Sequence, residues 1–374
     1  MQETGFAFCM KIKKIALTGF RNYEFETAEF DPAINIICGN NAQGKTNLLE
    51  SVYLLSTGRS FRTRFDKELV NFSYSSANIL ADIWSHDRDQ TVSIDFKPGQ
   101  AKRILVNGVK KSASELGQTV NTVLFSPDDL GLIREGAAVR RRLLDNAVSQ
   151  IKPQYADALT ELNRLLEHKT RILKDRYEKP SLLDTLDEFS DGICRCSARI
   201  IRYRASYTLR LAEAAKEIHE EFSSGESMET VYRTVSTVTD PLASEKEIYY
   251  QVLQHFESHR AAELESEQCL TGAHKDDLEI LINGMSARAY ASQGQTRTAA
   301  LSLKLAEREI LRRETGEYPI LLLDDVLSEL DSRRQEFVLN SIGGGQTLIT
   351  CCEDEGISGR TGGKILPVEK GRIG

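Results

Sequence analysis

The chain has 374 residues, 40% of them hydrophobic, which is enough for two domains or for one domain with a large insertion. Its 48 basic and 55 acidic residues give a net charge of −7, which excludes a protein that coats nucleic acid by its overall charge but allows local basic patches. No run of eighteen apolar residues occurs and the N-terminus lacks a signal pattern, so we expect no membrane span and a cytoplasmic protein.

The first motif is a phosphate-binding loop between a predicted strand and a predicted helix. Residues 34–38 form an apolar run of strand length, and residues 47–55 have helical spacing. Between them, G-N-N-A-Q-G-K-T fits the pattern G-x-x-x-x-G-K-[ST], which requires this strand–turn–helix context; a chance glycine-lysine turn is the alternative. Lys45 is expected on the β- and γ-phosphates of ATP and Thr46 on Mg²⁺. The expected nucleotide-binding residues are Gly39, Asn40, Asn41, Ala42, Gln43, Gly44, Lys45, Thr46 and Asn47.

Strand-like patterns lie on both sides of the centre of the chain. Residues 77–96 alternate apolar and polar side chains, as half-buried strands do. Apolar runs precede Asn107-Gly108 and Asn283-Gly284, dipeptides typical of tight hairpin turns. These segments predict antiparallel β-structure on either side of a central region.

The central region, from about residue 139 to residue 268, has the spacing of long helices. Apolar side chains recur three and four residues apart through residues 155–166 and again through residues 189–218. We therefore expect an α/β fold with a mixed sheet, flanking helices and an antiparallel part. The predicted domains are a P-loop ATPase core of residues 1–130 and 270–374 and a helical lobe of residues 131–269 inserted into it.

Clusters of basic residues run against the acidic average and are candidates for contact with DNA phosphates. For each cluster the alternative is a solvated surface. The cluster after the phosphate loop, which includes Arg59, Arg62 and Arg64, has a second alternative, a role beside the nucleotide. None has the interleaved aromatic residues that stack on unpaired bases. The candidates are Arg59, Arg62, Arg64, Arg140, Arg141, Arg142, Arg195, Arg199 and Arg202, with a further cluster at Lys169, Arg171, Lys174 and Arg176.

Two carboxylates end an apolar run late in the chain. Residues 320–323 are all aliphatic, which is typical of a strand buried on both faces in a parallel sheet. Carboxylates at the tip of such a strand are costly unless something positive lies there, and Mg²⁺ at the phosphates meets that need. Asp324 is expected to bind the metal, and Asp325 to orient or deprotonate the attacking water. Two solvated aspartates are the alternative.

The segment Ser292-Gln293-Gly294-Gln295, followed by a helical run, resembles the signature motif of the ABC-type ATPases. This resemblance implies that Ser292 and the backbone amides of Gln293, Gly294 and Gln295 contact the γ-phosphate of ATP held by a second subunit. A helix N-terminus, with its free N–H groups and partial positive charge, suits that contact. Residues 328–331 resemble the loop that crosses between the two sites of such a dimer.

The chain as a whole resembles the RecF family, a compact branch of the RecF/SMC group of ATPases. The resemblance implies an ATP-dependent homodimer that binds double-stranded and gapped DNA. It also implies a weak ATPase that works with RecR and the RecO pathway to load recombinase at gaps and stalled forks, with hydrolysis opening the dimer. The matching segments are residues 17–23, 58–63, 123–130, 141–145, 271–277 and 292–295.

The chain departs from the family pattern in several places. Lys275 replaces an arginine, which puts a bidentate contact there in doubt. Cys351-Cys352 stand where many ABC ATPases have a histidine that senses the γ-phosphate. Asp325 stands where many ABC ATPases have glutamate and RecF-like proteins have aspartate; because the shorter side chain holds the water less closely, we expect slow hydrolysis. The seven cysteines have no metal-ligand spacing and are expected to be packing residues without disulfides. Similar chains begin near Met10, so residues 1–9 are expected to be an extension or a misassigned start.

Three other functions remain open. A transporter's nucleotide-binding subunit predicts only a short insertion between the loop and the signature, which the long segment from Thr46 to Ser292 does not suit. A scaffold that binds ATP without hydrolysing it is disfavoured by the paired carboxylates. A phosphotransferase leaves the signature unexplained. The sequence alone assigns no role to Asp128-Asp129 or to residues 272–277, which match the family and are either close to the nucleotide or structural.

Overall fold

The computed structural model describes residues 9–223, 225–352 and 357–374. The expectation that residues 1–9 are an extension or a misassigned start therefore lies outside the described residues, except for Cys9. The chain divides into two compact units, Met1–Gly131 with Arg297–Gly374, and Leu132–Thr296. Among the described residues, no helix combines the length and the apolar character needed to cross a bilayer.

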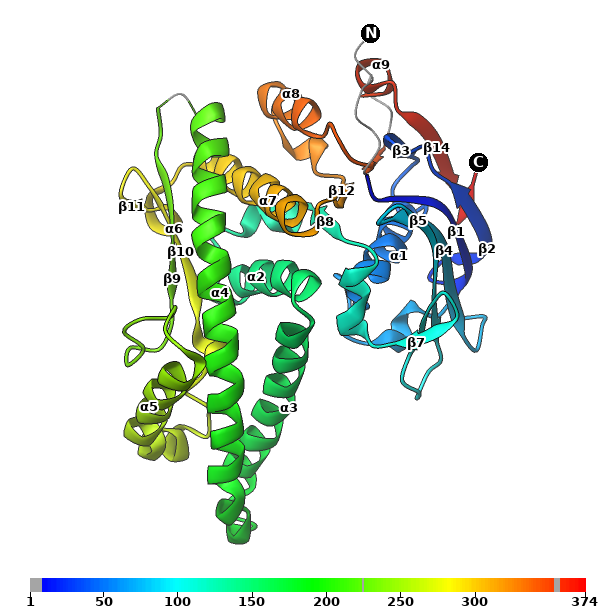
Figure 1. Cartoon of the computed structure of the whole chain (residues 1–374). Coiled ribbons are helices and arrows are strands. Elements are labelled where there is room, and N and C mark those ends of the chain that lie inside the picture. The colour runs from blue at the N-terminus through cyan, green and yellow to red at the C-terminus, as the bar shows by residue number, and fades with distance from the viewer. Residues whose placement is uncertain (1–8, 224, 353–356) are drawn as a thin grey trace. The chain divides into compact units, whose positions relative to one another are not determined.

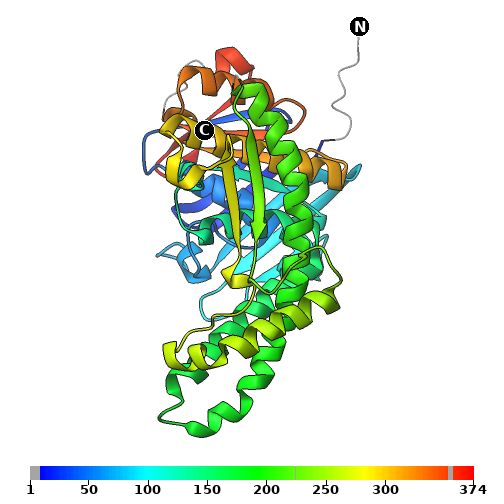
Figure 2. The same cartoon turned by 90° about the vertical axis from the view of Figure 1, so that its left-hand side faces the viewer.

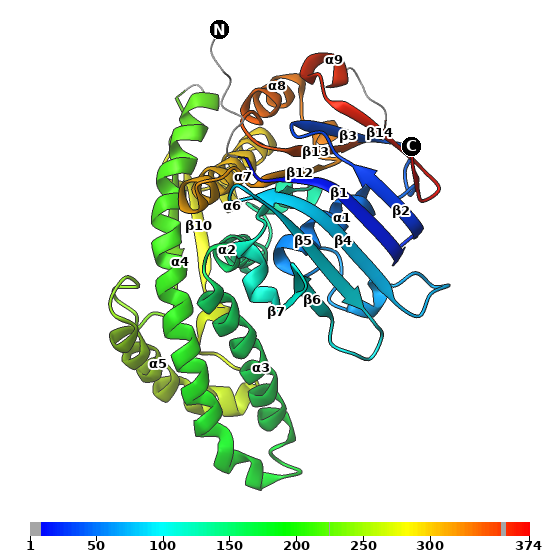
Figure 3. The ribbon, with the colours of Figure 1, turned by 45° about the vertical axis from the view of Figure 1, so that its right-hand side comes forward.

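The first unit contains a six-stranded antiparallel sheet built from the N-terminal part of the chain (Figure 3). In sheet order its strands are β2 (Tyr23–Glu29), β1 (Lys11–Phe20), β4 (Ala77–Ser85), β5 (Arg88–Phe96), β6 (Arg103–Val106) and β7 (Val109–Lys111). The alternating stretch 77–96 forms two strands joined at His86 and Asp87, which both have positive φ. Asn107-Gly108 makes the predicted hairpin turn between β6 and β7.

A second, mainly parallel sheet carries the motifs. In sheet order its strands are β15 (Arg372–Ile373), β14 (Lys364–Glu369), β3 (Ile34–Cys38), β13 (Thr347–Cys351), β12 (Ile320–Asp324) and β8 (Thr122–Phe125). All are parallel except β15. Strands β12 and β8 are buried along their whole length, as the continuous apolar run of β12 predicts. Because parallel strands end at one edge, the segments that follow β3, β13 and β12 lie together there.

Helix α1 (Lys45–Thr57) contacts strands of both sheets. Its Leu48 and Val52 belong to the same buried cluster as Ile15 of β1 and Leu322 of β12. The helix that follows the phosphate loop is therefore held by the core on both sides, so its N-terminus has a fixed place. Two short helices, α8 (Ser332–Ser341) and α9 (Ile357–Thr361), complete this unit apart from α7, described below.

The second unit is built around long helices, as the central spacing predicts. They are α2 (Ala137–Ile151), α3 (Pro153–Asp175), α4 (Leu186–Phe222) and α5 (Glu245–Ser266). Figures 1 and 2 show α3 and α5 lying beside α4, the longest of them. Each of these helices keeps an apolar row buried, for example Ile193, Ile200 and Leu211 of α4.

A small sheet in this unit corrects the expected second domain boundary. Strand β9 (Met228–Arg233) was not predicted; it pairs with β10 (Asp277–Ile282), which forms the Asn283-Gly284 hairpin with β11 (Met285–Ser286). Residues 270–296, including the short helix α6 (Ala287–Tyr290), therefore pack with the helical unit rather than with the core. Helix α7 (Gln293–Thr315) starts in this unit and continues into the other one.

Candidate functional site

The phosphate loop has the predicted local structure: β3, a turn of residues 39–44, and α1. Gly44 has φ 125°, and a Cβ there would lie 2.7 Å from Nδ2 of Asn22 and 2.9 Å from the hydroxyl of Tyr23. A Cβ on Gly39 would lie 2.2 Å from the carbonyl oxygen of Val368. Both glycines of the motif are thus required by close packing, Gly39 against backbone and Gly44 against side chains. Glycine at these positions also lets the loop curl around an anion.

Lys45 already lies across the loop. Its ammonium donates to the carbonyl oxygens of Gly39 at 2.6 Å and Asn40 at 3.3 Å. Lys45 is only 4% exposed. Gln43 ties the loop to the C-terminal hairpin, because the backbone N–H groups of Lys370 and Gly371 donate to its side-chain and main-chain oxygens. The lysine charge is therefore held where the loop amides converge, ready for a polyphosphate.

Asp324 and Thr46 meet at the same edge of the sheet. The Thr46 hydroxyl donates to Oδ1 of Asp324 at 3.0 Å, and the Thr350 hydroxyl donates to the same atom at 2.9 Å. Asp324 is 7% exposed, and burial raises its pKa, although both hydroxyls act against that rise. A hydroxyl and a carboxylate this close are the two protein ligands that Mg²⁺ usually takes beside nucleotide phosphates. The residues present therefore fit the expected magnesium site.

Asp325 has an unusual backbone. Its φ is 50°, in the left-handed region, and its N–H donates to Oγ1 of Thr350 at 2.8 Å. Aspartate tolerates this conformation better than most residues. The carbonyl oxygen of Asp325 accepts from the hydroxyl of Ser328 at 2.7 Å, so the turn after β12 is held from both ends. Asp325 is half-buried.

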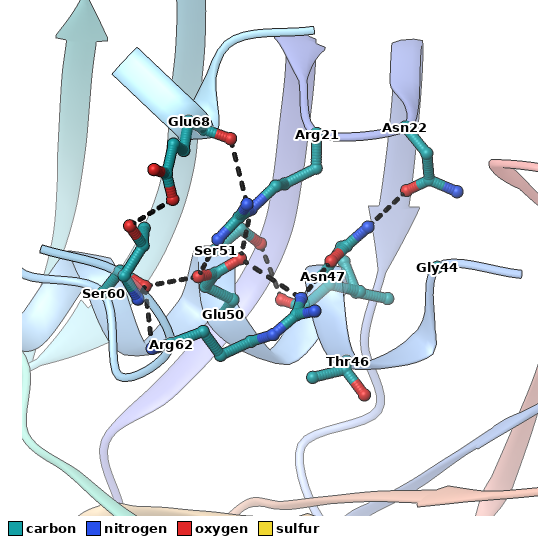
Figure 4. A network of polar contacts seen from close by, with 12 residues as sticks. Arg21, Asn22, Gly44, Thr46, Asn47, Glu50, Ser51, Ser60, Arg62 and Glu68 are labelled. Atoms are coloured by element: carbon teal, nitrogen blue, oxygen red, sulfur yellow. Dashed lines mark hydrogen bonds and ion pairs between the residues drawn. The ribbon is translucent and has the colours of Figure 1, made fainter. Parts of the chain in front are cut away.

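A polar network continues from the loop along α1 (Figure 4). Arg21 makes a bidentate pair with the fully buried carboxylate of Glu50, with contacts of 2.8 and 2.7 Å. Arg62, a predicted DNA candidate, donates to Oδ1 of Asn47 at 2.6 Å and lies 3.8 Å from Glu50. Asn47 in turn donates to Asn22 at 2.7 Å. Arg62 is therefore tied to the phosphate-loop helix, as the nucleotide-side alternative predicts.

The signature segment forms the start of α7. The Ser292 hydroxyl accepts from the backbone N–H of Gln295 at 3.2 Å, while the Gln295 side-chain oxygen accepts from the N–H of Ser292 at 2.8 Å, a reciprocal cap. Nε2 of Gln295 donates to Oε1 of Glu226 at 2.8 Å. Ser292 and Gln293 are exposed. The predicted helix start is confirmed, and Glu226, just before β9, holds it.

Residues 272–277 form a buried corner of the helical unit. Arg204, 1% exposed, donates to Oδ2 of Asp276 and to the carbonyl oxygen of Ala273, both at 2.7 Å, and to Asp145 at 2.7 Å. Burial raises the pKa of Asp276, and the nearby guanidinium of Arg204 acts against that rise. Lys275 is exposed. Of the two readings left open for this segment, these contacts support the structural one.

The other unassigned pair, Asp128-Asp129, lies in the first unit. Strand β8 pairs with β12 so that Phe125 faces Leu323, which places the residues after Phe125 at the edge that carries Asp324. Asp129 accepts from the backbone N–H of Ser126 at 2.8 Å and so closes this turn. Asp128 is exposed.

The basic candidates fall into different environments. Arg140 is not a surface residue: it is 3% exposed and makes a bidentate pair with Asp277 at 2.7 and 2.9 Å, so its prediction as a DNA contact is wrong. Arg141 is half-buried and donates to the carbonyl oxygen of Asp276. Lys169, of the further cluster, is 1% exposed and pairs with buried Glu263. These three side chains hold the helical unit together.

Of the remaining candidates, Arg176 is 8% exposed and pairs with Glu267 at 3.0 Å. The others lie at the surface. Arg195 and Arg199 pair with Asp191 at 2.7 Å and Glu245 at 3.3 Å. Arg59, Arg64, Arg142 and Arg202 are exposed. For Arg64, Arg142 and Arg202, the described part of the chain supplies no ion-pair partner, so these three guanidiniums keep their full charge for phosphate contacts.

Sequence reasoning missed several residues around the site. Thr350 and Glu226 carry no motif, and each acts on a motif residue far away in the chain. Arg21 lies in one of the segments that resemble the RecF family, but its pairing with Glu50 could not be read from that resemblance. The burial of Arg140 had a signal, because it lies three and four residues before the apolar Leu143 and Leu144 on α2.

Comparison with known proteins agrees with these features. The family model described as RecF/RecN/SMC N terminal domain matches residues 11–359. A protein of Acetivibrio thermocellus named DNA replication and repair protein RecF is 40% identical over 367 residues, covering 97% of this chain and 99% of that protein. A protein of the same name from Clostridium tetani is 38% identical over 366 residues, with coverage of 97% and 99%.

Solved structures give the same result. One described as the recombination mediator protein RecF-ATP in the RecFOR pathway has a TM-score of 0.89 at 35% identity and covers 100% of this chain and 99% of its own. The Smc head domain from Pyrococcus furiosus, at 17% identity and a TM-score of 0.54, covers 97% of this chain and 95% of its own and shares the fold alone. The ABC-type ATPase core predicted from the motifs is confirmed, and the chain belongs to the RecF family.

Proposed function

We propose that the protein is a DNA-repair ATPase that dimerises when it binds ATP and then holds duplex or gapped DNA. The observation that carries this proposal is the 3.0 Å hydrogen bond from Thr46 to Asp324, which joins the phosphate loop to the acidic strand. A relative whose structure is described as an ATP complex in the RecFOR pathway supports it. Such an activity belongs to the cytoplasm, where bacterial DNA is repaired.

In the proposed reaction, Lys45 and the loop amides hold the β- and γ-phosphates, and Thr46 and Asp324 provide two ligands of Mg²⁺. The metal, when bound, supplies charge neutralisation at the phosphate oxygens. Asp325 orients a water molecule for in-line attack on the γ-phosphorus and accepts its proton. The bond from the γ-phosphorus to the oxygen that bridges it to the β-phosphate breaks, and the products are ADP and inorganic phosphate. Because aspartate reaches less far than glutamate, the water is held loosely and hydrolysis is slow.

The exposed Ser292 and the capped start of α7 are proposed to close the site of a second copy. Their hydroxyl and amides would approach the γ-phosphate held by the other protomer, so that two ATP molecules lie in one symmetric interface. Hydrolysis would remove the charge that joins the protomers and open the dimer. RecR and the RecO pathway are the partners proposed from the family, with loading of recombinase as the outcome.

Solution mass tests this mechanism directly. We expect a monomer without nucleotide and with ADP, and a dimer with ATP. Ser292→Arg should remain a monomer with ATP while still binding ATP, because the substitution leaves the phosphate loop intact. A monomer under every condition would contradict the clamp, and an ATP dimer of the Ser292→Arg variant would remove the signature from the interface.

Asp325→Asn separates an ATPase from an ATP-binding scaffold. If Asp325 is the base, phosphate release should fall by about 10²–10⁴-fold while ATP-induced dimerisation persists. Unchanged phosphate release would remove Asp325 from the mechanism and favour the scaffold.

DNA contacts are best tested on the unpaired surface arginines. Arg64→Glu, Arg142→Glu and Arg202→Glu should each weaken duplex binding by the ATP dimer and lower the steepness of its salt dependence if they contact phosphates. Arg195→Glu is the matched control, because Asp191 already neutralises that guanidinium. Equal effects of all four variants would show a diffuse electrostatic attraction rather than a defined surface.

A further inference from the structure

Two cysteines face each other where the phosphate loop begins. Cys38 ends β3, Cys351 ends β13, and the two are register partners on adjacent strands. Their sulfur atoms lie 3.1 Å apart. A third cysteine, Cys352, is exposed; its thiol donates to Oδ1 of Asn41 at 3.0 Å and lies 3.8 Å from the ammonium of Lys45. None of the three forms a disulfide, and Cys38 and Cys351 come from two strands that are far apart in the chain.

The geometry of the facing pair suits a disulfide. Adjacent strands lie about 4.7–4.9 Å apart, which is within the range of about 4.4–6.8 Å between Cα atoms that disulfides span. Register partners also point their side chains to the same face of the sheet. Closing the bond requires the two sulfur atoms to approach from 3.1 Å to about 2.05 Å, a movement that small side-chain rotations can supply.

Four cysteines elsewhere in the chain lie in surroundings that favour the unreactive thiol. Burial raises the pKa of the Cys194 thiol to about 12, and it also raises the pKa values of Cys9, Cys196 and Cys269. These four stay protonated at neutral pH, and the thiolate is the reactive form. They therefore serve as internal references for the pair beside the loop.

We propose that Cys38 and Cys351 form a reversible disulfide that weakens nucleotide binding. With a peroxide as the two-electron oxidant, one thiolate attacks a peroxide oxygen, water leaves, and a sulfenic acid forms. The second sulfur then displaces hydroxide from the sulfenic sulfur and a second water leaves. In total, two thiols and one hydrogen peroxide give one disulfide and two waters, and a dithiol reductant reverses the reaction.

The bond would act on the loop through Gly39. This residue directly follows Cys38, and its N–H donates to the carbonyl oxygen of Cys351 at 3.3 Å. Its own carbonyl oxygen and that of Asn40 hold the ammonium of Lys45. Drawing the strand ends together shifts these carbonyls and hence the lysine. We expect the affinity for ATP to fall by about tenfold or more, the size of one lost charge-assisted contact.

The effect on nucleotide rests on the proposed function, whereas the disulfide does not, so the experiment measures both. The full chain is treated with hydrogen peroxide, blocked with a thiol reagent and digested. Mass spectrometry should find a peptide linking Cys38 to Cys351, and ATP titration of the undigested protein should show the loss of affinity. Treatment with dithiothreitol should reverse both changes.

Single substitutions identify the sulfur atoms. Each variant is compared with its own reduced form, so that a change in basal affinity does not affect the result. In Cys38→Ser and Cys351→Ser the peroxide effect on ATP affinity should vanish, whereas Cys352→Ser should keep it because the facing pair remains. Cys196→Ser is the reference for a cysteine remote from the loop and should behave as the unmodified chain.

The outcomes are distinct. Absence of the linked peptide at peroxide concentrations that oxidise an equimolar dithiol would overturn the disulfide. A linked peptide with unchanged ATP affinity would overturn its effect on the loop, and loss of the effect in Cys352→Ser would assign it to that thiol instead. If the reduced chain binds no ATP, the proposed function fails while the linked peptide still decides whether the disulfide forms.

Discussion

Thr350 binds both carboxyl-bearing residues at the end of β12 through a single hydroxyl. Its Oγ1 donates to Oδ1 of Asp324 at 2.9 Å and accepts the N–H of Asp325 at 2.8 Å. The strand that carries it, β13, lies between β3 and β12 in the sheet. One side chain on the intermediate strand therefore sets the orientation of the metal ligand and the conformation of the proposed base.

Replacing that hydroxyl should slow hydrolysis. In Thr350→Val, Asp324 loses a donor and Asp325 loses the acceptor of its N–H, so phosphate release should fall by about 10–100-fold, as for other residues that orient metal ligands. Thr350→Ser keeps the hydroxyl and should stay close to the unmodified chain. Phosphate release and ATP affinity, measured on both variants, test this; equal rates for the two would show that the hydroxyl is not needed.

Breaking the buried pair between Arg21 and Glu50 should destabilise the first unit. Arg21→Met leaves a fully buried carboxylate with weaker partners, Ser60 and Arg62, at a cost near the lower end of about 3–5 kcal/mol. The double variant Arg21→Met with Glu50→Leu removes both charges and should regain most of that loss. Urea unfolding midpoints measure the difference; a double variant no more stable than the single one would contradict this account.

Glu226 should matter for the dimer and not for the monomer. Glu226→Ala removes the acceptor of Gln295, which loosens the cap of the signature helix, so the ATP-induced dimer should dissociate about 5–10-fold more readily. ATP binding by the monomer should not change. Glu226→Gln retains an acceptor oxygen and should be milder, and Glu229→Ala, an exposed carboxylate on β9, is the control. Sedimentation at several protein concentrations gives the dissociation constants.

His274 should make the helical unit sensitive to acid. Burial lowers the pKa of its imidazole from 6.5 to about 4, and its Nε2 donates to the carbonyl oxygen of Cys269 at 3.0 Å. The unfolded chain therefore binds a proton more readily than the folded chain. Stability from this group is complete above about pH 6.5 and is lost as the pH falls toward 4.

The matched variant is His274→Gln, which keeps a donor for Cys269 and does not titrate. Its unfolding midpoint should change less than that of the unmodified chain between pH 6.5 and pH 4. Parallel curves for the two proteins would assign the acid sensitivity to other groups, such as His219 and His255, whose pKa values burial also lowers.

The nucleotide site could be predicted from the sequence because each part is local. Strand, loop and helix follow one another around Lys45. The uninterrupted run of aliphatic residues before Asp324 predicts a parallel strand that is buried on both faces. The two Asn-Gly turns were equally local. Strand β9 was missed because its six residues lie between long helices and its partner β10 comes more than forty residues later.

Polar pairs between residues far apart in the chain could not be predicted from the sequence. Arg140, Arg141 and Arg142 are consecutive and chemically identical, yet one is buried, one half-buried and one exposed. Successive helical residues differ by about 100° in direction, so a run of arginines cannot share one surface. The acceptors that decide their roles, Asp276 and Asp277, lie on a segment whose position depends on the whole helical unit.

The strand order of the parallel sheet makes the first unit depend on segments that lie far apart in the chain. Strand β3 pairs with β13 on one side and β14 on the other, so Ile36 and Ile37 gain their first neighbours only at Ile349 and Thr350 and their second only at Ile365 and Leu366. The antiparallel sheet and the helical unit are each continuous in the chain and can form earlier. Until β13 and β14 have been translated, the apolar strand that leads into the phosphate loop is uncovered, a state in which strands are prone to aggregate.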